Sequence, residues 1–459
     1  MTIGTSTYNW TYQYNGLNQL LSMTDSCGNT TNYDYKNSGR LKDKYLPNGI
    51  TGAYSYNPNG DINSIVYISG TTDILNLSYP SYDNAHNILT QGINGVTKTF
   101  SYDNLNQLTG VNVGGVQTEQ FTYDPVGNRL TSIDNPTWTY NTDNELSGYG
   151  ATNMTYDANG NMTADSSDGS SLSYDFENRL ASFVTSSVTA NYLYDPQGRR
   201  LQKTVNSVVT RYLWDGATMI AELDGTNQIT RLYTYNPQSM EPVSTAIGCT
   251  AYFYITDHLM TPQMLTSISG TTVWYAELSS FGTANVITST VTNNLRFPGQ
   301  YADAESGLYY NYHRYYNSEI GRYIQEDPND FASFVIEIQK MISFQFTQNS
   351  LDVIKIIAFQ TMQSNVENIK IPSQLIYDNN KNLFLYTLNN PLNYIDITGY
   401  QKSNEAQKCF LKCYAINSFA CIPGCGLLCS EEDEANFEQC ETGCHYLAER
   451  YCRACQVFS

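Results

Sequence analysis

The sequence predicts an all-β protein made of repeated β-hairpins, followed by a small helical, cysteine-rich C-terminal domain. Tyrosine occurs 39 times, whereas Lys and Arg together total only 24. Tyr and Thr favour strands, and Asn and Gly favour tight turns. Cysteine is concentrated at one end, because all but two of the 11 cysteines lie between Cys409 and Cys455. This break in composition marks a separate domain.

A tyrosine-centred pattern recurs along the first half of the chain. The tyrosine is followed by Asp or Asn, then by a turn residue such as Gly, and then by an apolar residue. The clearest copies begin at Tyr56, Tyr123, Tyr156 and Tyr194, and softer copies begin at Tyr14, Tyr35, Tyr82, Tyr102, Tyr140 and Tyr174. In one copy Phe121 and Tyr123 alternate with polar residues, and the turn chemistry of Asp124 to Gly127 follows. Each copy therefore predicts a β-hairpin, and hairpins repeated in this way stack into one continuous sheet.

The repeated tyrosines have two interpretations. We expect them to form packing ladders along one face of the sheet, with hydroxyl groups that need water or polar partners. The alternative is an aromatic stripe that binds a ligand, as on the surface of other solenoid proteins.

Charge and hydropathy exclude some functions. The net charge of -19 disfavours nucleic-acid binding. The chain lacks a run of about 18 apolar residues, so we expect no membrane-spanning helix. The first residues, MTIGTSTYNWTYQYNG, have no charged or apolar leader, so we expect no signal peptide. Because they enter directly into the repeat, we expect the chain to be the C-terminal end of a longer protein.

Three later stretches carry a family resemblance. The first runs from Tyr252 to Gly282 and contains His258-Leu-Met-Thr-Pro, with Met260 where glycine is usual. The second, from Leu295 to Pro328, contains RFPGQ, ESGLYY, RYY, GRYI and DP. The third, NLFLYTLNNPLNYIDITGY, runs from Asn382 to Tyr400. With these stretches the sequence resembles the RHS/YD-repeat family, which includes polymorphic toxins, toxin-complex subunits and teneurins.

The resemblance implies a spiralling sheet that forms a hollow cocoon. The RHS core segment would plug its end, and the variable C-terminal domain would be held inside until delivery. We expect five parts, namely residues 1–250 (YD/RHS repeats), 251–328 (RHS repeat-associated core), 329–381 (a helical insertion), 382–400 (the end of the core) and 401–459 (the cysteine-rich domain).

The resemblance also implies self-cleavage by two aspartates, as in aspartyl proteases. The matching residues are Asp327 and Asp396, with Arg322 as a nearby charge that could hold one carboxylate ionised. The cut would lie between Tyr400 and Gln401 or next to Tyr400.

This sequence departs from the family pattern around both aspartates. Asp330 stands where glycine is usual after Asp327, and Ile397 replaces the proline after Asp396. The insertion between them carries apolar residues at helical spacings and predicts one or two amphipathic helices. The alternative is that both aspartates only shape turns.

The cysteine-rich tail predicts a disulfide-stapled helical hairpin, because cysteines four apart share one helix face. The candidate disulfide residues are Cys409, Cys413, Cys421, Cys425, Cys429, Cys440, Cys444, Cys452 and Cys455. A zinc site that includes His445 is the rival, although the spacing is not that of zinc knuckles. The odd number leaves one thiol free, or paired with Cys27, Cys249 or another chain. We expect no metal and no cofactor.

The favoured function is the delivery of a small C-terminal toxin or effector by an RHS shell. The expected partners are the chain's own C-terminal domain as cargo, an immunity protein and export machinery, and the expected location is secreted or at the cell surface. Apart from self-cleavage, no enzymatic motif is recognisable. The alternatives are a non-enzymatic adhesion protein and a displaced, non-functional RHS end.

Overall fold

The computed structural model describes residues 2–3, 6–327 and 382–399. Their regular structure consists of antiparallel strands and one short 3-10 turn, so the predicted all-β fold is confirmed. The predicted helical insertion, 329–381, and the cysteine-rich domain, 401–459, lie outside the described residues. No helix in the described part is long and apolar enough to cross a membrane.

The first long sheet has 12 strands, and each strand pairs with its neighbours in the sequence. Its strands are β3 (Thr11–Tyr14), β4 (Leu20–Thr24), β5 (Thr30–Tyr35), β6 (Leu41–Tyr45), β7 (Ile50–Tyr56), β8 (Ile62–Ser69), β9 (Thr72–Tyr82), β10 (Ile88–Ile93), β11 (Val96–Tyr102), β12 (Leu108–Val113), β13 (Val116–Tyr123) and β14 (Arg129–Ser132). A separate small hairpin precedes it, formed by β1 (Thr2–Ile3) and β2 (Ser6–Thr7).

The second long sheet has 16 strands, again in sequence order. Its strands are β15 (Trp138–Tyr140), β16 (Leu146–Tyr149), β17 (Thr152–Tyr156), β18 (Met162–Asp165), β19 (Ser170–Tyr174), β20 (Leu180–Val184), β21 (Thr189–Tyr194), β22 (Arg200–Val205), β23 (Val208–Asp215), β24 (Thr218–Asp224), β25 (Ile229–Tyr235), β26 (Pro242–Ile247), β27 (Thr250–Thr256), β28 (Pro262–Ser267), β29 (Thr272–Leu278) and β30 (Ala284–Ser289).

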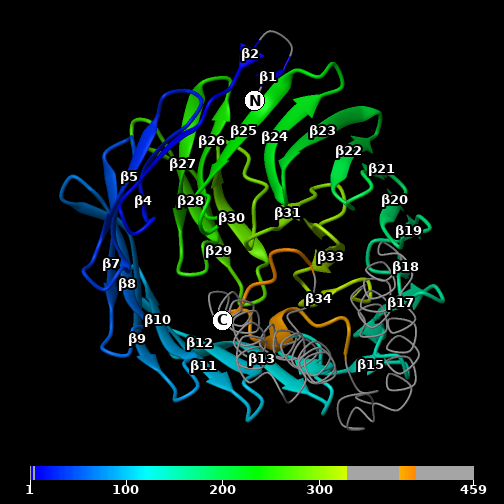
Figure 1. The fold of residues 1–459 in the computed structure, drawn as a ribbon. Helices are drawn as coiled ribbons and strands as arrows, with labels where there is room; N and C mark the ends of the chain where they lie inside the picture. The colour runs from blue at the N-terminus through cyan, green and yellow to red at the C-terminus, as the bar shows by residue number, and fades with distance from the viewer. Residues whose placement is uncertain (1, 4–5, 328–381, 400–459) are drawn as a thin grey trace, which may run out of the picture. The chain divides into compact units, whose positions relative to one another are not determined.

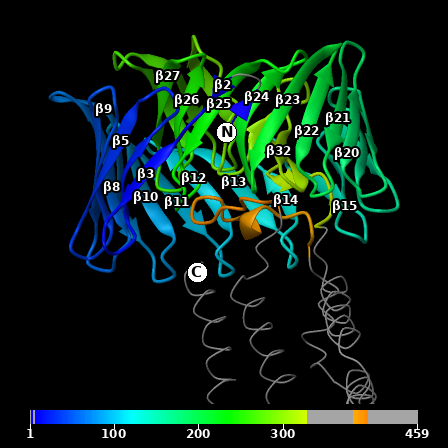
Figure 2. The same cartoon turned by 45° about the horizontal axis from the view of Figure 1, so that its top comes forward.

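A small four-stranded sheet follows, and both long sheets curve around it (Figure 1). Its strands are β31 (Tyr301–Ala302), β32 (Tyr309–Asn311), β33 (Arg314–Asn317) and β34 (Arg322–Tyr323). Residues 382–399, here called the closing segment, contain the 3-10 turn η1 (Thr387–Asn389). Figure 2 shows the closing segment, in orange, beside the ends of strands of the first sheet.

The hairpin turns that follow the repeat tyrosines begin at the residue after the tyrosine. At the end of β13, the Asp124 carboxylate accepts hydrogen bonds from the backbone N–H groups of Val126 (3.0 Å) and Asn128 (2.8 Å). Gly127 has a φ of 86°, which glycine adopts without steric cost. The Tyr-Asp pattern therefore ends one strand and reverses the chain into the next, as the sequence predicts.

The tyrosines of the repeat join neighbouring hairpins. The Tyr123 hydroxyl donates a hydrogen bond of 2.7 Å to the carbonyl of Leu108, the first residue of β12. Tyr102 and Tyr194 make the same bond to the preceding hairpin, at 2.9 and 2.8 Å. These contacts give the hydroxyl groups the polar partners that the sequence requires, and they favour the packing interpretation of the tyrosines.

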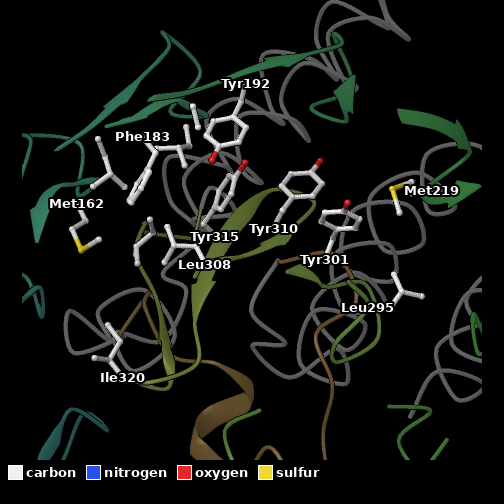
Figure 3. Close-up of a cluster of buried hydrophobic side chains, with 14 of the residues drawn as sticks. Met162, Phe183, Tyr192, Met219, Leu295, Tyr301, Leu308, Tyr310, Tyr315 and Ile320 are labelled. Atoms are coloured by element: carbon white, nitrogen blue, oxygen red, sulfur yellow. The ribbon is translucent and has the colours of Figure 1, made fainter. Parts of the chain in front are cut away.

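The largest apolar core lies between the second sheet and the four-stranded sheet. Tyr301, Tyr310 and Tyr315 of the small sheet are buried against wall residues that include Tyr192 and Phe183 (Figure 3). These buried aromatic side chains hold the four-stranded sheet against the second long sheet. Burial of ring area is the largest favourable contribution that such side chains make.

The two long sheets meet at a seam that contains no shared strand ladder among the described residues. Side chains cross it instead. Lys44 of β6 forms a buried ion pair with Glu241 at 2.5 Å, just before β26. Cys27, in the turn after β4, forms a disulfide with Cys249, in the turn after β26. These two cysteines therefore pair with each other, which the sequence did not indicate.

Candidate self-cleavage site

The closing segment returns to the edge of the four-stranded sheet. The Tyr323 backbone N–H donates a hydrogen bond of 2.9 Å to the Phe384 carbonyl, and Arg322 forms an isolated bridge with Leu385. Tyr386 of the same segment stacks on Phe297, with ring centroids 5.5 Å apart. This docking carries the end of the segment, including Asp396, into the interior of the core.

Asp327 and Asp396 meet at one arginine. The Arg314 Nη2 atom lies 3.4 Å from a carboxylate oxygen of Asp396 and 3.7 Å from one of Asp327. All three side chains are buried, with at most 2% of each exposed. The structure thus brings together the two aspartates that the sequence singles out, and it adds Arg314 as the charge between them.

Two further side chains hold Asp396 in place. The Tyr323 hydroxyl donates a hydrogen bond of 2.7 Å to the Asp396 carboxylate. The Asn311 side-chain amide donates to the Asp396 backbone carbonyl and to the Tyr323 hydroxyl, both at 2.8 Å. Asp396 is therefore fixed through its carboxylate by Tyr323 of β34 and by Arg314, and through its backbone by Asn311 of β32.

Burial governs the acidity of Asp396. Desolvation raises its pKa to about 6, against the lowering effect of the Arg314 charge and the Tyr323 hydrogen bond. The nearby Asp327 carboxylate raises this pKa further, because two like charges disfavour each other. A carboxyl group with such a pKa holds its proton in mildly acidic solution, as a general acid requires.

Arg322, the cation expected from the sequence, lies elsewhere. Its guanidinium donates a hydrogen bond of 2.6 Å to the Asn144 carbonyl and lies 4.8 Å from the Phe384 ring centre. Arg322 and Tyr323 are consecutive strand residues, so their side chains point to opposite faces. Because Tyr323 faces Asp396, Arg322 faces the turns of the repeat instead.

Arg314 also binds the end of the closing segment. Its Nε atom donates to the Gly399 carbonyl, and its Nη1 atom donates to the Leu383 carbonyl at 2.8 Å. Gly399 has a φ of 69°, and a Cβ there would collide with the Asn311 carbonyl. The backbone immediately before the expected cut is therefore held tightly against the aspartate pair.

Several predicted site residues lie outside the described residues. These are Tyr400, Gln401 and the nine cysteines of the tail (Cys409, Cys413, Cys421, Cys425, Cys429, Cys440, Cys444, Cys452 and Cys455). Within the described ranges, no three His, Cys, Asp or Glu side chains are grouped to hold a metal ion.

Several known proteins are similar in sequence to most of the described part of the chain. The Teneurin YD-shell family model matches residues 81–352. The tRNA nuclease WapA of Bacillus subtilis is 30% identical over 334 residues, which are 69% of this chain and 14% of that protein. The toxin protein Tse5 of Pseudomonas aeruginosa is 25% identical over 361 residues, which are 69% of this chain and 25% of that protein. The chain thus spans a quarter or less of the length of these relatives.

Solved structures share the fold. The crystal structure of TcdB2-TccC3-TEV covers 85% of this chain, with a TM-score of 0.58 and 16% identity. The Photorhabdus luminescens Tc holotoxin pore covers 86%, with a TM-score of 0.58 and 15% identity. The chain covers 21% of each. The repeat, the fold and the family match agree with the resemblance found in the sequence, and the chain belongs to the Teneurin YD-shell family of RHS/YD-repeat proteins.

Proposed function

We propose that this chain is part of an RHS shell that holds residues 401–459 as a toxin or effector module and cuts itself next to Tyr400. Relatives named a tRNA nuclease and a toxin protein support the toxin part of the proposal. The product would be secreted or presented at the cell surface, with export machinery and an immunity protein as partners.

One observation carries the cleavage proposal. Arg314 contacts Asp327, Asp396 and the Gly399 carbonyl at once. Two buried carboxyl groups beside a fixed backbone are the arrangement that aspartyl-type hydrolysis needs. Asp396 also accepts a hydrogen bond from the backbone of Thr398, as Asp124 does within its own turn, but a turn-shaping aspartate has no need of a buried arginine shared with a second aspartate.

The proposed reaction is hydrolysis of one peptide bond. Neutral Asp396 donates a hydrogen bond to the scissile carbonyl, while the Asp327 carboxylate takes a proton from a water molecule. The water oxygen then bonds to the carbonyl carbon, the C–N bond breaks, and the amine leaves with a proton. The products are a new carboxylate on the shell and a free N-terminus on the released piece.

Intact-mass measurement under denaturing conditions tests the cut. The full chain has a mass of 51.6 kDa, and we expect wild-type protein to give two pieces that add up to this mass plus one water. Asp327→Asn and Asp396→Asn should each leave one full-length species. Asp143→Asn, at an exposed turn position, is the matched control and should cut normally. A single uncut species in wild-type protein would refute the cleavage proposal.

Retention of the C-terminal piece is tested separately. We expect both pieces to co-elute in native gel filtration and to separate only in denaturant. A C-terminal epitope tag should resist added protease in the native protein. Free elution of the small piece, or immediate loss of the tag, would refute retention of the C-terminal piece by the shell.

A further inference from the structure

The closing segment contacts the repeat through a row of asparagines. Asn382, Asn389 and Asn390 are at most 3% exposed, although each carries a polar amide. Buried amides are retained only where they are hydrogen-bonded. All three donate to the hairpin turns of the first sheet, whose ends lie beside the closing segment (Figure 1).

The three contacts reach three successive repeats. The Asn390 Nδ2 atom donates to the Asn87 side-chain oxygen at 2.8 Å, in the turn between β9 and β10. The Asn389 Nδ2 atom donates to the Gln107 side-chain oxygen at 2.9 Å, in the turn between β11 and β12. The third contact follows one repeat later.

In that third contact, the Asn382 Nδ2 atom donates to the Asn128 side-chain oxygen at 2.5 Å, in the turn between β13 and β14. Asn389 also donates to the Gly127 carbonyl of this turn at 2.8 Å. Chain order in the closing segment therefore runs opposite to the order of the repeats, and Asn389 contacts two successive turns.

The three acceptors occupy the same position of the repeat, since Asn87, Gln107 and Asn128 each lie five residues after the repeat tyrosine. Each acceptor also donates its own amide N–H to the turn aspartate, at distances of 2.8, 3.0 and 2.9 Å. Because the amide nitrogen of each acceptor is bonded to the aspartate, its amide oxygen faces the closing segment. The aspartate of the Tyr-Asp pattern thus orients a side chain that the closing segment can recognise.

Residues at the end of the four-stranded sheet contact later turns of the repeat in a similar way. The Arg322 guanidinium donates to the Asn144 carbonyl at 2.6 Å, in the turn between β15 and β16. The Gln325 side chain donates to the Asn178 carbonyl at 2.5 Å, in the turn between β19 and β20. Residues just before Asp327 therefore bind the turns of the second sheet, as residues before Asp396 bind those of the first.

We propose that Asn389 and Asn390 are positioning residues that couple the aspartate pair to the register of the repeats. Asp396 follows this row in the closing segment, and Asp327 follows Arg322 and Gln325. The two carboxyl groups meet at Arg314 only when both sets of turns stand in their native order. Cleavage, on which this inference rests, would then occur only in a shell whose repeats are correctly stacked.

A size-swap experiment in the full chain tests the inference. Gln107→Asn shortens one partner by a methylene and Asn389→Gln lengthens the other. Each single change should slow the cut roughly tenfold, the scale of one lost buried hydrogen bond. The double variant should recover most of the wild-type rate. Asn285→Ala, at an exposed position of β30, is the control and should cut at the wild-type rate.

Amide hydrogen exchange separates this inference from the cleavage proposal. In uncut Asp327→Asn protein, adding Asn389→Ala or Asn390→Ala should increase exchange in residues 382–399 and leave the long sheets unchanged. This result is expected even if wild-type protein never cuts, so it does not depend on hydrolysis. Unchanged protection of the closing segment, or a double swap as slow as the single variants, would overturn the inference.

Discussion

Arg200 and Asp303 form an ion pair inside the protein, with the arginine Nη2 atom 3.0 Å from a carboxylate oxygen. The pair joins β22 of the second long sheet to the residue that follows β31 of the four-stranded sheet, and both side chains are at most 1% exposed. The Arg200 guanidinium also lies 4.4 Å from the centre of the Tyr310 ring. Opposite charges here keep the pKa of Asp303 below its usual range despite burial.

Removal of the Asp303 carboxylate should weaken the attachment of the four-stranded sheet to the second long sheet. Asp303→Ala leaves a buried guanidinium without its anion, which should lower the free energy of unfolding by about 3–5 kcal/mol. Urea denaturation followed by tryptophan fluorescence measures the loss. Lys42→Ala breaks an exposed pair with Asp43 and is the control, for which we expect little change. Equal effects of the two substitutions would contradict an anchoring role for Asp303.

The tyrosine hydroxyl groups should contribute to the stacking of hairpins. Tyr123→Phe leaves the buried Leu108 carbonyl without its donor, which should cost about 1 kcal/mol or somewhat more. Tyr394→Phe, at a side chain 45% exposed, is the matched control. The difference in urea midpoint between the two variants measures the contribution of the hydroxyl. An identical midpoint would show that the ring alone supports the stack.

The seam should weaken when its disulfide is reduced. The cysteines are 222 residues apart in sequence, and a cross-link that closes so long a loop stabilises a fold by about 5 kcal/mol in the chain-entropy model. Dithiothreitol should therefore lower the urea midpoint of wild-type protein. A Cys27→Ser/Cys249→Ser double variant should start from the lower midpoint and respond less. Peptide mapping without reductant must also recover the cross-linked pair, and two free thiols would contradict it.

Local turn chemistry made the strands of the two long sheets predictable from the sequence. All ten tyrosines of the pattern end a strand, and at nine of them an Asp or Asn follows whose side chain accepts hydrogen bonds within the turn, Lys36 after Tyr35 being the exception. Two copies escaped the pattern. Tyr235 ends β25 before Asn236, and Trp214 donates a hydrogen bond of 2.9 Å to the Arg200 carbonyl in place of a tyrosine.

The site was less predictable, because its partners are chosen by tertiary packing. The sequence identifies both aspartates, yet Arg314 and Arg322 lie in the same stretch and no local rule ranks them. Strand alternation would have separated them, once Tyr323 was known to face Asp396. The Cys27–Cys249 pair and the asparagine contacts join residues hundreds of positions apart, which no repeat pattern reveals.

The raised pKa of Asp396 gives the proposed cut a defined pH dependence. Between the ordinary pKa of an aspartate and about 6, folded protein holds a proton that unfolded protein has lost. This contribution to stability is present at low pH and is lost as the pH rises through about 6. The cut needs the same proton, so its rate should fall about tenfold for each pH unit above that value.

Refolding from urea into buffers of pH 5 to pH 8, with intact-mass sampling over time, would measure this rate in about the range where the group titrates. Asp396→Asn should abolish the cut at every pH, and Asp143→Asn should keep the wild-type profile. The urea midpoint of uncut Asp327→Asn protein should also fall as Asp396 ionises, at a lower pH than the wild-type cutting rate does, because this variant lacks the Asp327 charge that raises the pKa of Asp396. A cutting rate that stays constant or rises toward alkaline pH would show that neutral Asp396 is not the acid, because ionisation removes the proton that polarises the scissile carbonyl.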